Sequence, residues 1–133
     1  MKNLSACGIA VLRIVVGIVF ISHGSQKLFT FGMHGVAGSF TQMGIPLPAV
    51  SSAVVTLVEF LGGIGVAFGL FTRPLAVLLA CDMLGAIFFV HFKNGFFMPA
   101  GYEYALTLLA ACITLVLAGG GSLAADSLIM NRR

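Results

Sequence analysis

Charged residues are scarce in this chain. Only 8% of its 133 residues are Asp, Glu, Lys or Arg, whereas 59% are hydrophobic. Because about a quarter of the residues in a soluble globular domain are charged, this composition excludes an ordinary soluble protein. The net charge of +3 is not concentrated in a basic stripe or a basic–aromatic cluster, so it does not indicate a nucleic-acid partner. We therefore expect a small integral membrane protein embedded in the lipid bilayer.

Motifs that carry redox or nucleotide chemistry by themselves are also absent. The sequence contains no Cys-x-x-Cys pair, no dinucleotide-binding fingerprint and no Walker motif. Cys7, Cys81 and Cys112 are far apart in the sequence and outside the expected outer loops, so we interpret them as small packing residues. We expect neither a thiol oxidase nor a metal site, and any redox chemistry would need a bound cofactor or a partner protein.

Four long apolar segments are present instead. Each is close to the roughly 20 residues that an α-helix needs to cross a bilayer. They cover residues 8–29, 49–71, 74–92 and 102–121. The fold class that they predict is an all-α membrane protein, a four-transmembrane-helix bundle forming one domain over residues 1–133. Between the first two segments, Val36, Phe40 and Met43 follow helical spacing, which predicts a short interfacial helix on the outer side.

The basic residues predict the orientation in the membrane. Cytoplasmic loops are enriched in Lys and Arg, so the side with more basic residues is expected to be cytoplasmic. If both termini are on the inner side, that side carries Lys2, Arg73, Arg132 and Arg133, and the outer side carries only Lys27 and Lys93. We therefore predict that both termini are cytoplasmic.

Small residues at helical spacing indicate close packing between helices. Gly65 and Gly69 lie four positions apart in the second segment, and Ala110, Thr114 and Ala118 form a similar row in the fourth. Such rows let helix backbones approach closely inside a membrane. We interpret them as contacts within the bundle, with a homodimer as the alternative.

Each apolar segment also carries an ionisable residue. In chain order these residues are Arg13, Glu59, Asp82 and Glu103. A charge in hydrocarbon costs about 2.5–3.5 kcal/mol on insertion scales, so these side chains are expected to face the bundle interior. Arg13, Glu59 and Asp82 lie at overlapping depths along their helices, which predicts a buried ion pair of Arg13 with one or both acids. The sequence does not distinguish a structural ion pair from a proton relay.

A weak internal repeat relates the first segment to the third. The residues Gly17, Phe20, His23 and Phe29 have the same spacing as Gly85, Phe88, His91 and Phe97. The repeat indicates two helical hairpins, and it places the two histidines at similar depth in the outer half. The histidines could hydrogen-bond a quinone headgroup in an apolar pocket, ligate a haem, or cap helix ends at the headgroup level. Of the two ligands, quinone is favoured over haem.

Several short motifs, taken together, resemble the DoxX family of small bacterial membrane proteins. They are Leu12-Arg13 with Gly17 and Phe20, His23-Gly24-Ser25-Gln26-Lys27-Leu28-Phe29, Gly44-Ile45-Pro46, Glu59-Phe60-Leu61-Gly62-Gly63, Gly69-Leu70-Phe71-Thr72-Arg73, Gly95-Phe96-Phe97 and Gly101-Tyr102-Glu103-Tyr104. The resemblance implies a four-helix protein of the bacterial inner membrane. It also implies a redox context, because some relatives are membrane subunits of thiosulfate:quinone oxidoreductase or associate with other redox enzymes. Most members have no established activity.

The candidate ligand site lies in the outer half, where polar residues from all four segments converge. These residues are His23, Gln26, Lys27, Glu59, His91, Tyr102 and Glu103, with apolar walls from Phe20, Phe88, Phe96 and Phe97. We predict a lipophilic ligand such as a quinone headgroup, bound by an accessory subunit of a quinone-linked redox system that acts with a redox-enzyme partner. The alternative is a non-catalytic membrane scaffold or a small-solute carrier whose buried charges are structural.

Overall fold

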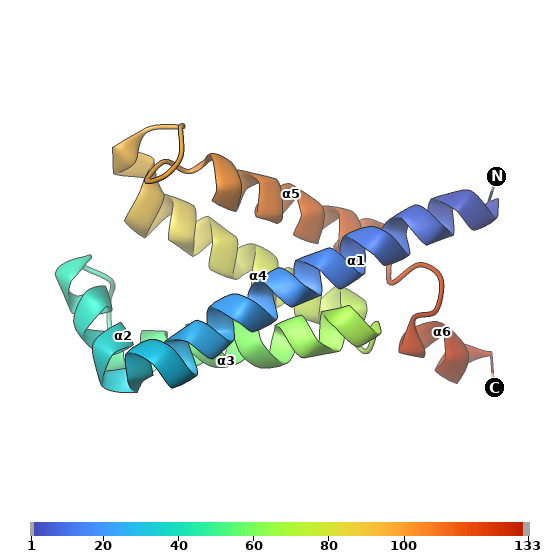
Figure 1. The fold of residues 1–133 in the computed structure, drawn as a ribbon, viewed down its shortest axis with the longest axis horizontal. Helices are drawn as coiled ribbons and strands as arrows, with labels where there is room; N and C mark the ends of the chain where they lie inside the picture. The colour runs from blue at the N-terminus through green and yellow to red at the C-terminus, as the bar shows by residue number, and fades with distance from the viewer. Residues whose placement is uncertain (1, 132–133) are drawn as a thin grey trace.

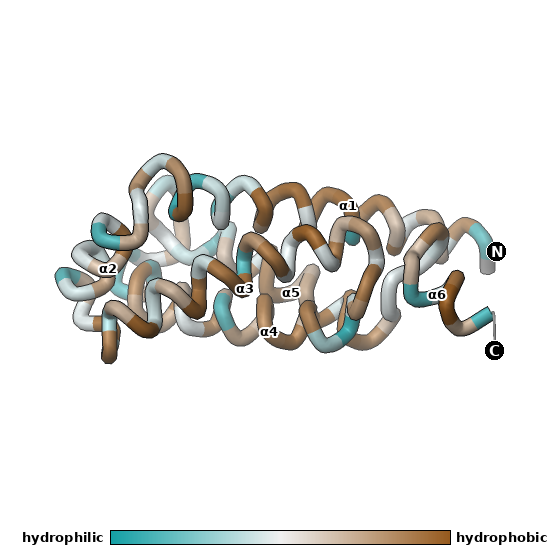
Figure 2. The backbone as a smooth tube through the Cα atoms, turned by 90° about the horizontal axis from the view of Figure 1, so that it is seen from below, coloured by the Kyte–Doolittle hydropathy of each residue, from teal (hydrophilic) through white to brown (hydrophobic). Residues whose placement is uncertain are grey.

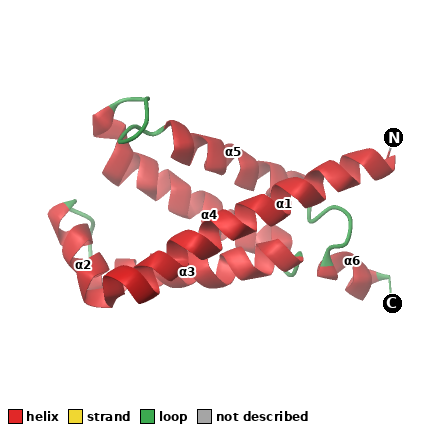
Figure 3. Ribbon diagram, in the orientation of Figure 1, coloured by secondary structure: helices red, strands yellow, loops and turns green. Residues whose placement is uncertain are grey.

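The described part of the chain is helical throughout. The computed structural model describes residues 2–131, and within that range it contains helices and connecting loops but no β-strand. Arg132 and Arg133, two of the basic residues used to predict the orientation, lie outside the described residues. The helices are α1 (Lys2–Ser25), η1 (Gln26–Phe31), α2 (Gly32–Gln42), α3 (Pro48–Phe68), α4 (Thr72–Ala86), η2 (Ile87–His91), η3 (Phe92–Asn94), α5 (Glu103–Ala118) and α6 (Ala125–Met130) (Figure 3).

Three helical stretches are long and apolar enough to cross a membrane. They are Asn3–Gln42, which contains α1, η1 and α2, then Pro48–Phe68 and Thr72–Asn94. The fourth predicted segment contains α5, which is apolar but has only 16 residues. At a rise of about 1.5 Å per residue, α5 is shorter than the roughly 30 Å of the hydrocarbon core.

The first helical stretch bends sharply at Gly32. This residue has a φ of 73°, a conformation that glycine adopts far more readily than other residues. The chain therefore turns away from the axis of α1 and continues as α2 across the end of the bundle (Figure 1). Val36 and Phe40 of α2 are buried and α2 packs on α3, so the apolar face predicted for this segment points toward the bundle.

Two antiparallel helix pairs make up the bundle. Helix α1 packs mainly on α3, and α4 packs mainly on α5, while α3 also contacts α4. The two pairs diverge toward the end that carries α2 (Figure 1). Close approach of α1 to α3 depends on glycine: a Cβ atom added to Gly17 would lie 2.7 Å from Ala67 Cα, and one added to Gly24 would lie 2.7 Å from Phe60 Cα.

Apolar side chains fill the core and also cover much of the outside. Phe20, Val66, Leu79 and Cys112 are buried in the core cluster. Many other apolar residues are exposed on the long helices, including Leu117, which is 75% exposed. Hydropathy is accordingly high along the middle of the bundle (Figure 2). A soluble protein of this size rarely exposes so much contiguous apolar surface, whereas a lipid-embedded one does so on every helix.

The segment after α5 folds back onto the bundle. The carboxylate of Asp126 accepts hydrogen bonds from the backbone N–H groups of Phe71 and Thr72, at 2.8 and 2.9 Å, and so caps the start of α4. The Ser122 N–H donates to the carbonyl of Ala6 in α1. As a result, the beginning of α1 and the end of α6 lie at the same end of the bundle (Figures 1 and 2).

Candidate functional site

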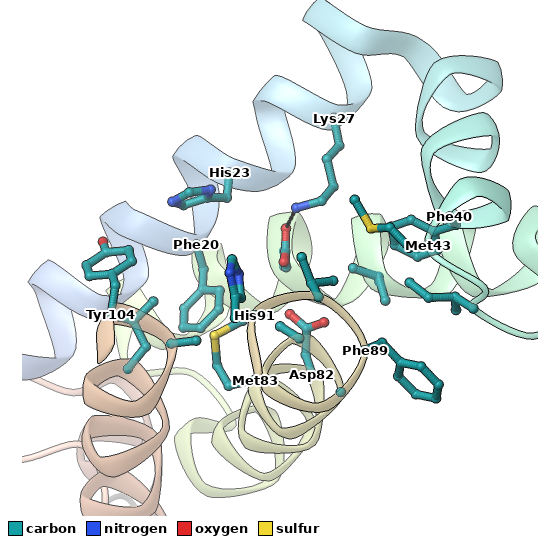
Figure 4. Close-up of a pocket in the computed structure, with 18 of the residues that line it drawn as sticks. Phe20, His23, Lys27, Phe40, Met43, Asp82, Met83, Phe89, His91 and Tyr104 are labelled. Carbon is teal, nitrogen blue, oxygen red and sulfur yellow. Dashed lines mark hydrogen bonds and ion pairs between the residues drawn. The ribbon is translucent and has the colours of Figure 1, made fainter. Parts of the chain in front are cut away.

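A cavity of about 520 Å³ lies between the two helix pairs, at the end where they diverge (Figure 4). Its polar and ionisable lining residues are His23, Lys27, Ser51, Glu59, Cys81, Asp82, His91 and Tyr104. Its apolar walls include Phe20, Phe40, Met43, Val55, Met83, Phe89, Val90, Met98 and Leu108. This volume and this mainly apolar lining are typical of pockets that hold a drug-sized organic molecule.

An ion pair and a second carboxyl group provide the charges of the cavity. The ammonium nitrogen of Lys27 donates to Glu59 Oε2 at 2.5 Å, and the Glu59 side chain is only 6% exposed. Asp82 lines the same cavity as this ion pair. Its Oδ2 atom is buried and has no hydrogen-bond partner within the described structure. Among the described residues of the lining, two carboxyl groups are therefore accompanied by a single ammonium group.

Two π-helical turns place functional side chains at the cavity. Lys27 belongs to η1, which follows directly on α1, and His91 is the last residue of η2, which follows on α4. A π-helical turn shifts the direction of the side chains that follow it, and such turns are frequent at functional sites. The apolar pattern of the sequence indicates helices here but not this local change in winding.

The two histidines line the same cavity with different partners. The Nδ1 atom of His91 lies 3.1 Å from the carbonyl oxygen of Ala100. Because a carbonyl oxygen only accepts, Nδ1 carries the proton, and in the neutral ring Nε2 is left as an acceptor. The ring of His23 lies against Tyr104, with 6.5 Å between the ring centroids. Figure 4 shows both histidines at one side of the cavity, near Phe20.

The other predicted polar residues do not line this cavity. Gln26 lines a separate, more open depression together with His23. Tyr102 packs on the rings of Phe92 and Phe96 in the loop region before α5. Glu103 accepts a hydrogen bond from the N–H of Met98 at 3.1 Å and so holds that loop.

The predicted aromatic walls are only partly correct. Phe20 is buried and lines the cavity. Its repeat partner Phe88 is 76% exposed, and Phe96 and Phe97 are also exposed and do not line the cavity. The walls come instead from residues that the sequence analysis did not assign to the site, such as Phe89. The sequence repeat therefore matches the positions of the histidines but not the packing of the phenylalanines.

The structure does not contain the predicted ion pair of Arg13 with Glu59 or Asp82. Arg13 is 2% exposed, and its guanidinium group donates to backbone carbonyls instead. Its bonds are Nε to Gly120 O at 2.8 Å, Nη1 to Ala67 O at 2.5 Å and to Val66 O at 3.3 Å, and Nη2 to Ser122 O at 3.3 Å. The prediction compared only the positions of these residues along their helices, that is, their depths in the membrane. It could not include the segment after α5, whose carbonyls lie closer to Arg13 than either acid does.

Within the described residues, no group of three or more His, Cys, Asp or Glu side chains is placed to hold a metal ion. Cys7, Cys81 and Cys112 are free thiols, and Cys112 is buried against the core.

Comparison with known proteins identifies the relatives of this chain. The DoxX family model matches residues 8–92. CatD of Bacillus subtilis, provisionally named an oxidoreductase, is 38% identical over 122 residues, which cover 92% of this chain and 87% of CatD. An uncharacterized protein of Haemophilus influenzae is 35% identical, over 90% of this chain and 88% of its own length. The inner membrane protein YqjF of Escherichia coli is 32% identical over 97% of both chains. No solved structure matches.

Proposed function

The chain belongs to the DoxX family of integral membrane proteins, and on that premise we propose that it is an accessory subunit of a quinone-linked redox system. In this proposal the cavity between the helix pairs holds the headgroup of a lipophilic quinone, and a redox-enzyme partner exchanges electrons with it. The name of CatD refers to an oxidoreductase and so favours a redox role for that relative. This similarity supports a test of a redox role in the present protein.

The cavity carries this proposal because its composition suits a quinone ring. Several aromatic and sulfur-containing side chains line it together with a few polar groups. The two carbonyl oxygens of a quinone accept hydrogen bonds. In the lining of the cavity, the remaining N–H groups of Lys27 and an N–H group of His23 can donate to them. Asp82 and Glu59 are the groups that could exchange protons during reduction.

We further propose how the chain lies in the membrane. Helix α5 is the fourth span. Its 16 residues are too few to cross the hydrocarbon core, and local thinning of the bilayer or inclusion of the flanking loop makes up the difference. Helix α2 lies at the outer interface with its apolar face on α3, and both termini are cytoplasmic. The cavity then opens in the outer half of the bilayer. Homodimer formation through the exposed row of Ala110, Thr114 and Ala118 is a further proposal within this scheme.

Extraction of the purified protein tests the quinone proposal directly. Protein isolated from its native membrane in mild detergent should yield close to one quinone per chain by mass spectrometry of the lipid extract. A short-chain quinone added to delipidated protein should raise the melting temperature. The absorbance spectrum of the same sample reports any bound haem.

Substitutions inside and outside the cavity test whether the quinone binds there. His23→Phe removes a donor that lines the cavity, so it should lower quinone occupancy at least several-fold. Glu103→Gln is the matched control, because this residue lies outside the lining and Gln can still accept the bond from Met98. If wild-type protein carries no stoichiometric quinone and shows no thermal shift, the alternative of a membrane scaffold or small-solute carrier replaces the redox role.

A further inference from the structure

The charges that line the cavity do not balance. Among the described residues of the lining, Lys27 is the only Lys or Arg, whereas Glu59 and Asp82 are both carboxyl groups. Lys27 is bonded to Glu59 Oε2, and Asp82 Oδ2 is buried without a partner. With neutral histidines and both acids ionised, the cavity would hold one uncompensated negative charge. An uncompensated charge in a buried, apolar site is costly and is normally removed by protonation or by a counterion.

Among the described residues, the surroundings of Asp82 contribute no second Lys or Arg side chain. Glu59 faces it from α3, Lys27 from η1 and the thiol of Cys112 from α5. His23 of α1 and His91 of η2 line the same cavity. With both histidines neutral, one proton shared by Glu59 and Asp82 completes the charge balance of the cavity.

Aromatic side chains are among the residues that line the same cavity. Phe20, Phe89 and Tyr104 line the cavity together with Asp82, as Figure 4 shows. The face of an aromatic ring attracts an organic cation, and the attraction is stronger where water is excluded. The volume of about 520 Å³ accommodates a molecule of drug size. A buried carboxylate oxygen without a hydrogen-bond partner, Asp82 Oδ2, in a cavity with aromatic lining residues suits a lipophilic cation.

We propose that the cavity binds a lipophilic monovalent organic cation, such as a quaternary ammonium or phosphonium ion, in exchange for the proton shared by Glu59 and Asp82. The cation enters with one positive charge and one proton leaves to water, so the cavity remains neutral before and after the exchange. This activity goes beyond the proposed quinone role and does not depend on it. It would make the protein a proton-exchanging cation binder, and a quinone would compete with the cation for the same space.

Calorimetry with tetraphenylphosphonium tests the exchange, because this ion is permanently charged and carries no proton of its own. Titration of detergent-solubilised wild-type protein near pH 7, in two buffers of different ionisation enthalpy, measures the protons released per bound cation. We expect close to one proton per cation. Because protons compete with the cation, the apparent affinity should rise with pH, by up to about tenfold per pH unit while the cavity still holds its proton.

Three controls isolate the role of the cavity charge. Tetraphenylborate, an anion of matched size, should bind at least tenfold more weakly than the phosphonium ion. Asp82→Asn should lower phosphonium affinity at least tenfold and abolish proton release, whereas Glu103→Gln, outside the lining, should change neither. Equal binding of anion and cation, or cation binding without proton release in the wild type, would overturn the proposal even if Asp82→Asn failed to fold. Neither outcome bears on quinone occupancy, which is measured separately.

Discussion

The ammonium nitrogen of Lys27 lies 2.5 Å from Glu59 Oε2, across the contact between η1 and α3. The Glu59 side chain is 6% exposed and that of Lys27 is 20% exposed, so the pair is largely removed from water. Removing one partner of such a pair leaves a buried charge, whereas removing both does not. This ion pair therefore connects the bend of the first helical stretch to the polar side of the cavity.

The first prediction concerns this pair. Lys27→Met should destabilise the protein by about 2–3 kcal/mol, somewhat less than for a fully buried pair because Lys27 is partly exposed. Adding Glu59→Gln should recover most of the loss, since the charge that was paired with Lys27 is then removed as well. Melting temperatures in detergent measure both effects. Lys93→Met changes an exposed lysine and should have little effect; similar melting of the Lys27 and Lys93 variants would contradict the prediction.

The second prediction separates the two accounts of Arg13. In the structure its guanidinium group satisfies four carbonyl oxygens near the ends of α3 and α5. Arg13→Met should therefore cost about 2–4 kcal/mol, because buried carbonyls lose charged donors. Arg73→Met, at an exposed arginine of the same end, should cost much less.

A double variant makes this test specific. If Arg13 neutralised Asp82, the change Asp82→Asn would restore stability to Arg13→Met. The structure predicts no such rescue, because no contact joins Arg13 to the cavity. Recovery of the melting temperature in the double variant would show that the ion pair expected from the sequence exists.

The third prediction concerns the contact between α1 and α3. A Cβ atom at Gly17 would lie within 2.7 Å of the backbone of Ala67, too close for any real packing. Gly17→Ala should therefore force the helices apart and destabilise the bundle by about 1–3 kcal/mol. Gly8→Ala in the same helix meets no neighbouring atom and should be neutral or slightly stabilising, since Ala favours helix. Equal melting temperatures for the two variants would exclude a tight α1–α3 contact.

The helical architecture was predictable because it depends on local pattern. Long apolar runs require helices in a membrane, and the helical spacing of Val36, Phe40 and Met43 predicted a helix here, of which the structure buries Val36 and Phe40. The family resemblance is confirmed by the match over residues 8–92. The resemblance motif that begins at His23 also includes Lys27, which lines the cavity.

The composition of the site depends on the rotation of each helix about its axis and on the positions of the connecting segments, which a single sequence does not specify. Depth along a helix placed Arg13 near the acids but did not indicate the direction of its side chain. Tyr102 and Glu103 were assigned to the site by depth as well, yet backbone bonds from Tyr102 N to Gly95 O and from Glu103 N to Phe96 O hold them in the loop. Gly24 was noted only as part of a motif, although its seven-residue spacing from Gly17 is a signal for the α1–α3 contact.

The last prediction is topological. Both described ends of the chain lie at one end of the bundle (Figure 1). Arg73 belongs to the first turn of α4, which Asp126 of α6 caps. Lys27 is bonded to Glu59 in the cavity, so among the described residues Lys93 is the Lys or Arg without an ion pair at the opposite end. The excess of Lys and Arg at the other end favours a cytoplasmic location for the termini. In protoplasts or spheroplasts, a membrane-impermeant maleimide should label Asn94→Cys in a cysteine-free background. It should not label Asn131→Cys until the membrane is permeabilised. The reverse labelling pattern would place the termini outside and the cavity in the inner half of the bilayer, where a ligand would have to enter from the cytoplasmic side.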